Sequence, residues 1–111
     1  MTRKQAARRC VAVLDEKFFK AFAEPARMAV FRELVLLGQA DIGAIAERLP
    51  QDRSVVSRHL QILADAGVLH ATKEGRRILY EVNGPEIVRK LEDMLEITRQ
   101  LQPICCPARG D

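Results

Sequence analysis

The stretch RSVVSRHLQILADAG, residues 53–67, has the residue pattern of an amphipathic helix. Val56, Leu60 and Leu63 are spaced i, i+4 and i+7, so they share one apolar face. The opposite face carries hydroxyl, guanidinium and carboxamide groups, which belong to Ser54, Ser57, Arg58 and Gln61. Such groups can hydrogen-bond to base edges and phosphates, and a DNA major groove is wide enough to admit a helix. A solvated polar face is the alternative, and the flanking segments decide between the two.

A second, shorter helix is expected just before this one. Asp41 suits its N-cap, residues 42–49 carry an apolar stripe, and Pro50 stops it. Residues 50–53 then form a tight turn into the next helix. Two short helices joined in this way over residues 41–66 are typical of a helix-turn-helix, in which the second helix is the recognition helix.

A β-hairpin is expected directly after the helix pair, over residues 68–82. Residues 68–73 and 77–82 have the pattern of short strands, and Gly75 in the turn can adopt a positive φ. The basic residues Lys73, Arg76 and Arg77 cluster at the hairpin tip. A basic hairpin at this position predicts a wing that lies along DNA phosphates or enters the minor groove. A solvated hairpin end is the alternative, and the position after the helix pair favours the wing.

The helix that precedes the pair is expected to begin at Pro25 and to end at Gly38, since proline suits a first helical turn and glycine a helix end. Its expected inward side consists of Met28, Phe31, Leu34 and Val35.

Two further helices are expected near the chain ends, over residues 7–22 and 85–102. The first has an apolar face made by Val11, Leu14, Phe18, Phe19 and Phe22. The second has one made by Ile87, Val88, Leu91, Met94, Leu95 and Leu101. Because the last helix follows a complete winged unit, its apolar face needs a cover, and we expect the two terminal helices to form a homodimer interface. Packing within one subunit is the alternative.

Length and composition are compatible with these expectations. The chain has 111 residues, which suits a single domain over residues 1–111, and 48% of them are hydrophobic. Its formal charge of +3 and pI near 9.0 are compatible with a polyanionic partner but are weak arguments alone. No apolar run is long enough to span a bilayer, and the basic N-terminus lacks the apolar core of a signal peptide. We therefore expect a cytoplasmic protein with reduced thiols and no membrane partner.

Four segments taken together resemble the ArsR/SmtB family of metal- and stress-sensing transcriptional repressors. They are FKAFAEPAR (residues 19–27), SVVSRHL (54–60), LADAGVL (63–69), and Gly75-Arg76-Arg77 with Tyr80. The resemblance covers residues 10–101. It implies a mainly α winged helix-turn-helix homodimer that binds double-stranded operator DNA and leaves it when an inducer binds.

The resemblance also bears on individual residues. It places DNA contacts on Arg53, Ser54, Ser57, Arg58 and Gln61, which agrees with the polar face described above. The helical phase of His59 puts it toward the buried edge, so we expect a structural role.

Two inducer sites that the resemblance suggests are missing from the sequence. The arsenic-type site has cysteines near the start of the third helix, where this chain has Gly38, Ala40 and Gly43 and retains only Asp41. The zinc-type site needs histidines on the last helix, which has none, because the chain's two histidines are His59 and His70.

The three cysteines, Cys10, Cys105 and Cys106, lie near the chain ends. Pro103 and Pro107 flank the pair, and we expect them to keep a cysteine-bearing tail, residues 103–111, out of helix. If the terminal helices pack antiparallel, within one subunit or across the dimer, the three sulfurs converge. Three thiolates suit a trigonal pyramidal As(III) or Sb(III) ion as inducer. Zn(II) would need a fourth ligand, whereas Cd(II), Pb(II), Hg(II) and Cu(I) also favour thiolates.

Other functions remain open at this stage. The cysteines could instead respond to oxidation or persulfide, or could be incidental. We expect no enzyme, because the sequence has no Gly-rich phosphate loop, no metalloprotease motif and no plausible nucleophile–base–acid set. A winged helix that binds only proteins is disfavoured by the basic wing tip. The sequence therefore predicts a DNA-binding repressor released by a trivalent metalloid.

Overall fold

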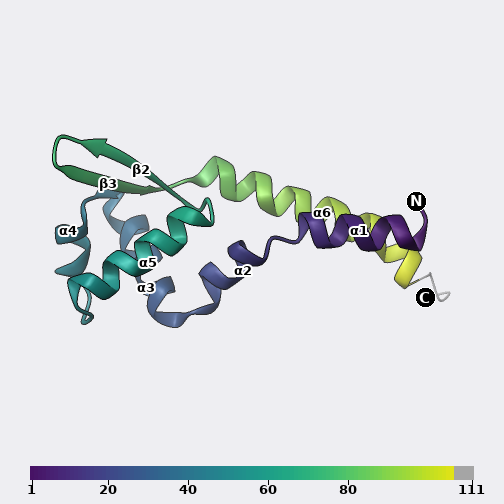
Figure 1. The fold of residues 1–111 in the computed structure, drawn as a ribbon, viewed down its shortest axis with the longest axis horizontal. Helices are drawn as coiled ribbons and strands as arrows, with labels where there is room; N and C mark the ends of the chain where they lie inside the picture. Colours follow the sequence, from purple (N-terminus) through teal and green to yellow (C-terminus); the bar gives the residue numbers. More distant parts are fainter. Residues whose placement is uncertain (107–111) are drawn as a thin grey trace. The chain divides into compact units, whose positions relative to one another are not determined.

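The computed structural model describes residues 1–106. The helices are α1 (Arg3–Val13), α2 (Glu16–Ala23), α3 (Pro25–Leu37), α4 (Ile42–Ala46), α5 (Arg53–Asp65) and α6 (Gly84–Cys105). The strands are β1 (Gln39–Ala40), β2 (Leu69–Glu74) and β3 (Arg77–Val82), and Figure 1 labels all of these elements except β1. Internal contacts divide the chain into a unit of residues 16–86 and a unit that combines residues 1–15 with the part of α6 from Ile87 onward. The expectation of a single domain over residues 1–111 stays a prediction.

The unit of residues 16–86 is a helix-turn-helix with a winged sheet. Its core contains Val56, Leu60 and Leu63 of α5, which have no exposed surface, together with Val30 and Leu34 of α3. The sheet is antiparallel with strand order β1-β3-β2. The wing strands β2 and β3 form the predicted hairpin and pair from Leu69 opposite Val82 to Glu74 opposite Arg77. β2 begins and ends one residue later than the expected strand over residues 68–73, so Glu74 belongs to the strand. β1 was not predicted, because two residues are too few to show an alternating pattern.

The turn and cap residues of this unit behave largely as expected. Gly75 turns the hairpin with φ of 62°, and Gly38 ends α3 with φ of 81°. The Asp41 carboxylate accepts a hydrogen bond from Ala44 N at 2.9 Å, so Asp41 is the N-cap of α4. α4 ends at Ala46 rather than at Leu49, and a tighter turn with i to i−3 hydrogen bonds follows it.

The inward side of α3 was predicted only in part. Leu34 is fully buried, but Val35 is 59% exposed and Met28 is 38% exposed. The helix is turned so that Glu33 and Leu34 occupy the buried positions. The apolar pattern alone predicts Val35 on the inward side, because it does not indicate that the charged Glu33 is buried.

Glu33 forms the buried ionic contact of this unit. Its side chain is 6% exposed and accepts a hydrogen bond from Arg48 Nε at 2.7 Å, with Arg32 Nη2 at 3.3 Å. The hydrogen bond from Arg48 holds the pKa of Glu33 below its ordinary value of 4.5. Because Arg48 follows α4, this contact fixes the first helix of the helix-turn-helix against α3.

The second unit pairs α1 with α6. Arg3 Nη2 donates to the Ile104 carbonyl at 2.9 Å, and Arg9 Nη1 donates to Gln100 Oε1 at 3.2 Å. Residue numbers rise along α1 as they fall along α6, so the two helices run antiparallel.

The predicted helix over residues 7–22 is wrong, because the chain forms two helices there. α1 starts early, since Thr2 and Gln5 form a capping box. It ends where Leu14 is extended, with ψ of 97°. Asp15 carries an ion pair to Lys90 Nζ at 2.7 Å, and aspartate favours helix starts over helix interiors.

The C-terminal segment also differs from the prediction. α6 was expected over residues 85–102, yet it continues through Pro103 to Cys105. A proline inside a helix removes its own hydrogen bond to the residue four positions back and crowds the carbonyl of that residue, which was the reason to expect an end here. The next turn still closes, because Cys106 N donates to the Gln102 carbonyl at 2.8 Å. Pro107 and the rest of the predicted tail lie outside the described residues. Within residues 1–106, we find no helix with the length and apolar character needed to span a membrane.

Replacing Glu33 by glutamine is expected to lower the free energy of unfolding at pH 7, because Arg48 loses its charged partner. The pKa of Glu33 is lower in the folded state, so its contribution to stability is complete above pH 4.5 and disappears as the pH falls through the folded pKa. Urea unfolding of both proteins at pH 7 and at lower pH measures this difference. The exposed Glu92→Gln variant is the control, and a Glu33→Gln effect that did not shrink on acidification would contradict the ionic account.

Candidate functional site

The polar face of α5 is open to solvent. Ser54, Ser57, Arg58 and Gln61 are exposed, as the sequence predicted, and the opposite face forms the core. Gln61 Nε2 donates to Asp65 Oδ1 at 2.8 Å, which fixes the carboxamide along the helix surface. One face of α5 therefore presents one guanidinium group, two hydroxyl groups and one carboxamide to solvent.

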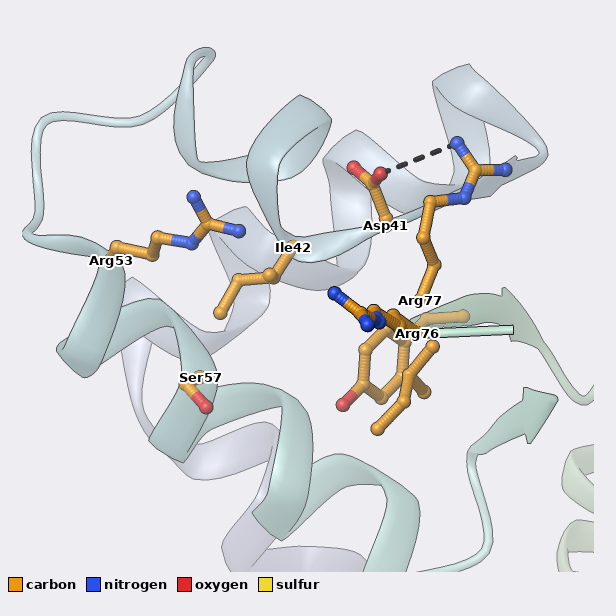
Figure 2. A pocket seen from close by; sticks show the side chains of 8 residues that line it. Asp41, Ile42, Arg53, Ser57, Arg76 and Arg77 are labelled. Carbon is orange, nitrogen blue, oxygen red and sulfur yellow. Dashed lines mark ion pairs between the residues drawn. The ribbon is translucent and has the colours of Figure 1, made fainter. Parts of the chain in front are cut away.

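A hollow of about 230 Å³ separates the start of α5 from the wing. Its lining residues are Asp41, Ile42, Arg53, Ser57, Arg76, Arg77, Ile78 and Tyr80. Figure 2 shows Arg53 and Ser57 on the α5 side and Arg76 on the wing side. The hollow therefore unites four of the residues predicted to bind DNA. Ser54, Arg58, Gln61 and Lys73 do not line it. Three guanidinium groups, those of Arg53, Arg76 and Arg77, together with the Ser57 hydroxyl suit a phosphate group.

Asp41 also contacts the wing, and nothing in the sequence indicated this contact. Asp41 Oδ2 lies 3.6 Å from Arg77 Nη1, and Arg77 Nη2 lies 3.8 Å from Glu74 Oε1. The pairing of β1 with β3 sets Ala40 opposite Tyr80, which places Asp41 next to the wing. β1 has only two residues and leaves no recognisable pattern in the sequence. The sequence therefore indicated the capping role of Asp41 but not its contact with the wing.

The histidines take no part in the polar face. His59 is half-buried, and this burial lowers its pKa, with the cation of Arg27 adding to the effect. The half-buried position agrees with the phase predicted for this residue. His70 is exposed on β2.

The three cysteines do not meet within one chain. Cys10 lies near the C-terminal end of α1, at the level of Gln100, whereas Cys105 ends α6 near Arg3. Five helical residues separate these levels, which corresponds to about 7.5 Å along the axis. Accordingly, residues 1–106 contain no group of three or more His, Cys, Asp or Glu side chains that could hold a metal ion. The expected convergence within one subunit fails because Cys10 was assigned to the start of a longer helix, whereas convergence across a dimer stays a prediction.

The adjacent thiols of Cys105 and Cys106 open onto a mainly apolar hollow of about 390 Å³. Its other lining residues, all from α6, are Leu95, Thr98, Arg99, Leu101 and Gln102. Both cysteines are exposed, and Cys10 is half-buried. The pair is therefore open to a small thiophilic ligand.

Sequence comparisons relate the chain to transcriptional regulators. The family model of a helix-turn-helix domain matches residues 22–71. An uncharacterized HTH-type transcriptional regulator of Methanocaldococcus jannaschii is 30% identical over 70% of this chain and 91% of its own length. The arsenical resistance operon repressor of Bacillus subtilis is 30% identical over 72% of this chain and 76% of its own length. A probable mercury resistance operon repressor of Streptomyces lividans is 30% identical over 64% of this chain and 56% of its own length.

Solved structures give the same relationship. An ArsR-like transcriptional regulator from Rhodococcus sp. RHA1 superposes with a TM-score of 0.67 at 27% identity, covering 86% of this chain and 92% of that chain. A homodimeric winged helix-turn-helix DNA-binding domain from Mycobacterium bovis has a TM-score of 0.61 at 27% identity, covering 91% and 88%. An antimony-specific transcriptional repressor has a TM-score of 0.57 at 28% identity, covering 77% of each chain.

Replacing Arg58 by alanine is expected to weaken binding to operator DNA about 5- to 150-fold, because one good bidentate guanidinium–base contact is worth about 1–3 kcal/mol. Fluorescence anisotropy with the promoter of the chain's own gene measures this loss. The control is Lys20→Ala, which removes an exposed cation of α2 that pairs with Glu16. Equal affinity of the Arg58→Ala and Lys20→Ala proteins for the promoter would show that Arg58 does not contact DNA.

Proposed function

The chain belongs to the ArsR family of winged helix-turn-helix transcriptional regulators, and on this premise we propose that it is a homodimeric repressor released from its operator by As(III) or Sb(III) at a cysteine site. The observation that carries the inducer assignment is the exposed Cys105–Cys106 pair beside an apolar hollow. The similarity to an arsenical resistance repressor and to an antimony-specific repressor supports this class of inducer.

DNA binding is proposed to use α5 and the wing together. The exposed face of α5, namely Ser54, Ser57, Arg58 and Gln61, reads base edges in the major groove. Arg53 and Arg76 border the hollow and hold a phosphate between them, and Lys73 adds charge at the wing tip. Phosphate contacts of this kind set the register of the protein on the duplex, and the α5 contacts supply sequence preference.

A homodimer is proposed to form through α1 and α6. α6 has a buried stripe containing Met94 and Ile97, and a second apolar stripe of Val88, Leu91 and Leu95 that is about half exposed. Val11 of α1 is 83% exposed. A second copy of the chain covers these residues in a self-complementary, two-fold interface. The homodimeric relative from Mycobacterium bovis supports this arrangement.

The proposed inducer site combines the Cys105–Cys106 pair of one subunit with Cys10 of its partner. Trivalent arsenic in water carries three hydroxyl groups, and each can leave as water when a cysteine thiol supplies its proton and the sulfur binds arsenic. The resulting centre has three As–S bonds and a lone pair. Such a bridge between subunits changes the spacing of the two recognition helices, which must match half-sites about one DNA turn apart. A coupling of about 1–3 kcal/mol suffices to weaken operator binding about 5- to 150-fold.

The second candidate is a repressor of the same family that responds to thiol oxidation or to persulfide. Cys105 and Cys106 are adjacent and exposed, which favours this candidate. A soft divalent metal such as Hg(II), Cd(II), Pb(II) or Zn(II) is the third, and the similarity to a mercury resistance repressor supports that class. Operator release measured against As(III), Sb(III), these metals and a persulfide separates the candidates.

The dimer is tested by replacing Leu91 with glutamate, which puts a charge on the exposed stripe of α6 and is expected to give a monomer. Size-exclusion chromatography with light scattering measures the mass, and operator affinity is expected to fall by more than about tenfold because one recognition helix reads only one half-site. Glu92→Gln, at the neighbouring exposed position, is the matched control. A dimeric Leu91→Glu protein with normal operator affinity would place the interface elsewhere.

The inducer site is tested by replacing cysteines with serine. A Cys105→Ser/Cys106→Ser double variant is expected to bind the operator normally and to stay bound when As(III) or Sb(III) is added, in an anisotropy titration under reducing conditions. Full release of this variant by As(III) would refute the site.

Mixed dimers then locate the third thiol. A Cys10→Ser homodimer is expected to lose the As(III) response. A mixed dimer of one Cys10→Ser subunit and one Cys105→Ser/Cys106→Ser subunit retains one complete site and is expected to recover part of the response. A fully responsive Cys10→Ser homodimer would assign the inducer to the cysteine pair alone.

A further inference from the structure

We propose that Asp41 is a positioning residue, which holds Arg77 of the wing away from DNA phosphates and so limits the sequence-independent part of DNA binding. This inference rests on the DNA binding proposed above. It reassigns Arg77, which the sequence placed among the phosphate contacts, to a contact within the protein.

The Asp41 carboxylate is fixed at both oxygens. Oδ1 accepts the hydrogen bond from Ala44 N at 2.9 Å, and Oδ2 lies 3.6 Å from Arg77 Nη1, the pair that Figure 2 marks with a dashed line. The side chain of Asp41 is only 29% exposed. Because the capping bond anchors it to the start of α4, the carboxylate cannot follow Arg77 toward a ligand.

Arg77 therefore differs from the other cations of the hollow. It lies near two carboxylates, Asp41 at 3.6 Å and Glu74 at 3.8 Å. Among residues 1–106, neither Arg53 nor Arg76 forms an ion pair, so both guanidinium groups can bind a phosphate without losing a charged partner. Arg77 must give up two carboxylates to do the same.

The position of Asp41 relates this contact to DNA. Asp41, Arg53 and Arg77 line the same hollow, so Arg77, once released, is close enough to join a phosphate contact there. A Cβ atom added to Gly43 would lie 3.5 Å from Asp41 Oδ1 and 3.8 Å from Arg53 Nη2, so both groups border this glycine. An additional phosphate contact strengthens binding to every sequence alike, because phosphates carry no sequence information. Retaining Arg77 therefore lowers the affinity for operator and non-operator DNA by a similar factor and leaves the base contacts of α5 unchanged.

The test replaces Asp41 by asparagine or by serine, since both are good N-cap residues and keep α4 capped without the charge. Anisotropy titrations use the operator duplex and a non-operator duplex of equal length, between about 50 and 200 mM salt. In both variants, the plot of log K against log salt is expected to steepen by about 0.9 for the non-operator duplex, which corresponds to one added phosphate contact. The slope for the operator duplex is expected to steepen equally, so the affinity for both duplexes rises several-fold and the ratio of operator to non-operator affinity stays nearly constant.

An Arg77→Gln background shows whether the effect passes through Arg77. There, the Asp41→Asn substitution is expected to leave the salt slope unchanged. An equal steepening in this background, or an unchanged slope in both Asp41 variants while the wild-type protein binds its operator normally, would overturn the inference alone. A wild-type protein that binds neither duplex at low salt would overturn the proposed function and this inference together.

Discussion

Complete burial of one face of α5 is the constraint on which the rest of the winged unit depends. Val56, Leu60 and Leu63 have no exposed surface, and burying each such side chain stabilises the fold by about 1.5–3 kcal/mol. Because the helical period is fixed, this burial also determines that Ser57 and Arg58 face solvent. The same apolar contacts that stabilise the domain therefore orient its polar recognition surface.

The sequence predicted those parts of the fold that depend on local patterns. The period of α5 and the proline and glycine that bound α3 are local signals, and the structure contains all of them. The break after α1 was missed because Val11, Leu14 and Phe18 keep a helical spacing across it, so the apolar pattern does not reveal where one helix stops. Pro103 was expected to end the last helix, because proline removes one hydrogen bond and crowds the carbonyl four positions back, yet α6 continues through it to Cys105.

The candidate sites were less predictable than the fold, because they depend on pairings between distant residues. The contact of Asp41 with Arg77 follows from strand β1, whose pairing with β3 leaves no signal in so short a segment. The contacts of Arg3 and Arg9 with α6 determine which residues of α6 lie beside Cys10. The apolar periodicity of the sequence does not predict these contacts. The residue types at these positions indicated ion pairing and thiol chemistry. Which of these groups lie close together depends on how the strands and helices pair, and the sequence did not show this pairing.

The strand order β1-β3-β2 has a consequence for how the protein behaves at high concentration. β2 is an edge strand, and all its residues after Leu69 are exposed, so its outer backbone groups are open to pairing with another sheet. Charged side chains on edge strands oppose such pairing. Lys73 and Glu74 therefore act against self-association of the wing, independently of DNA, and a natural sequence that lost the charge of this hairpin would gain a route to edge-to-edge aggregation.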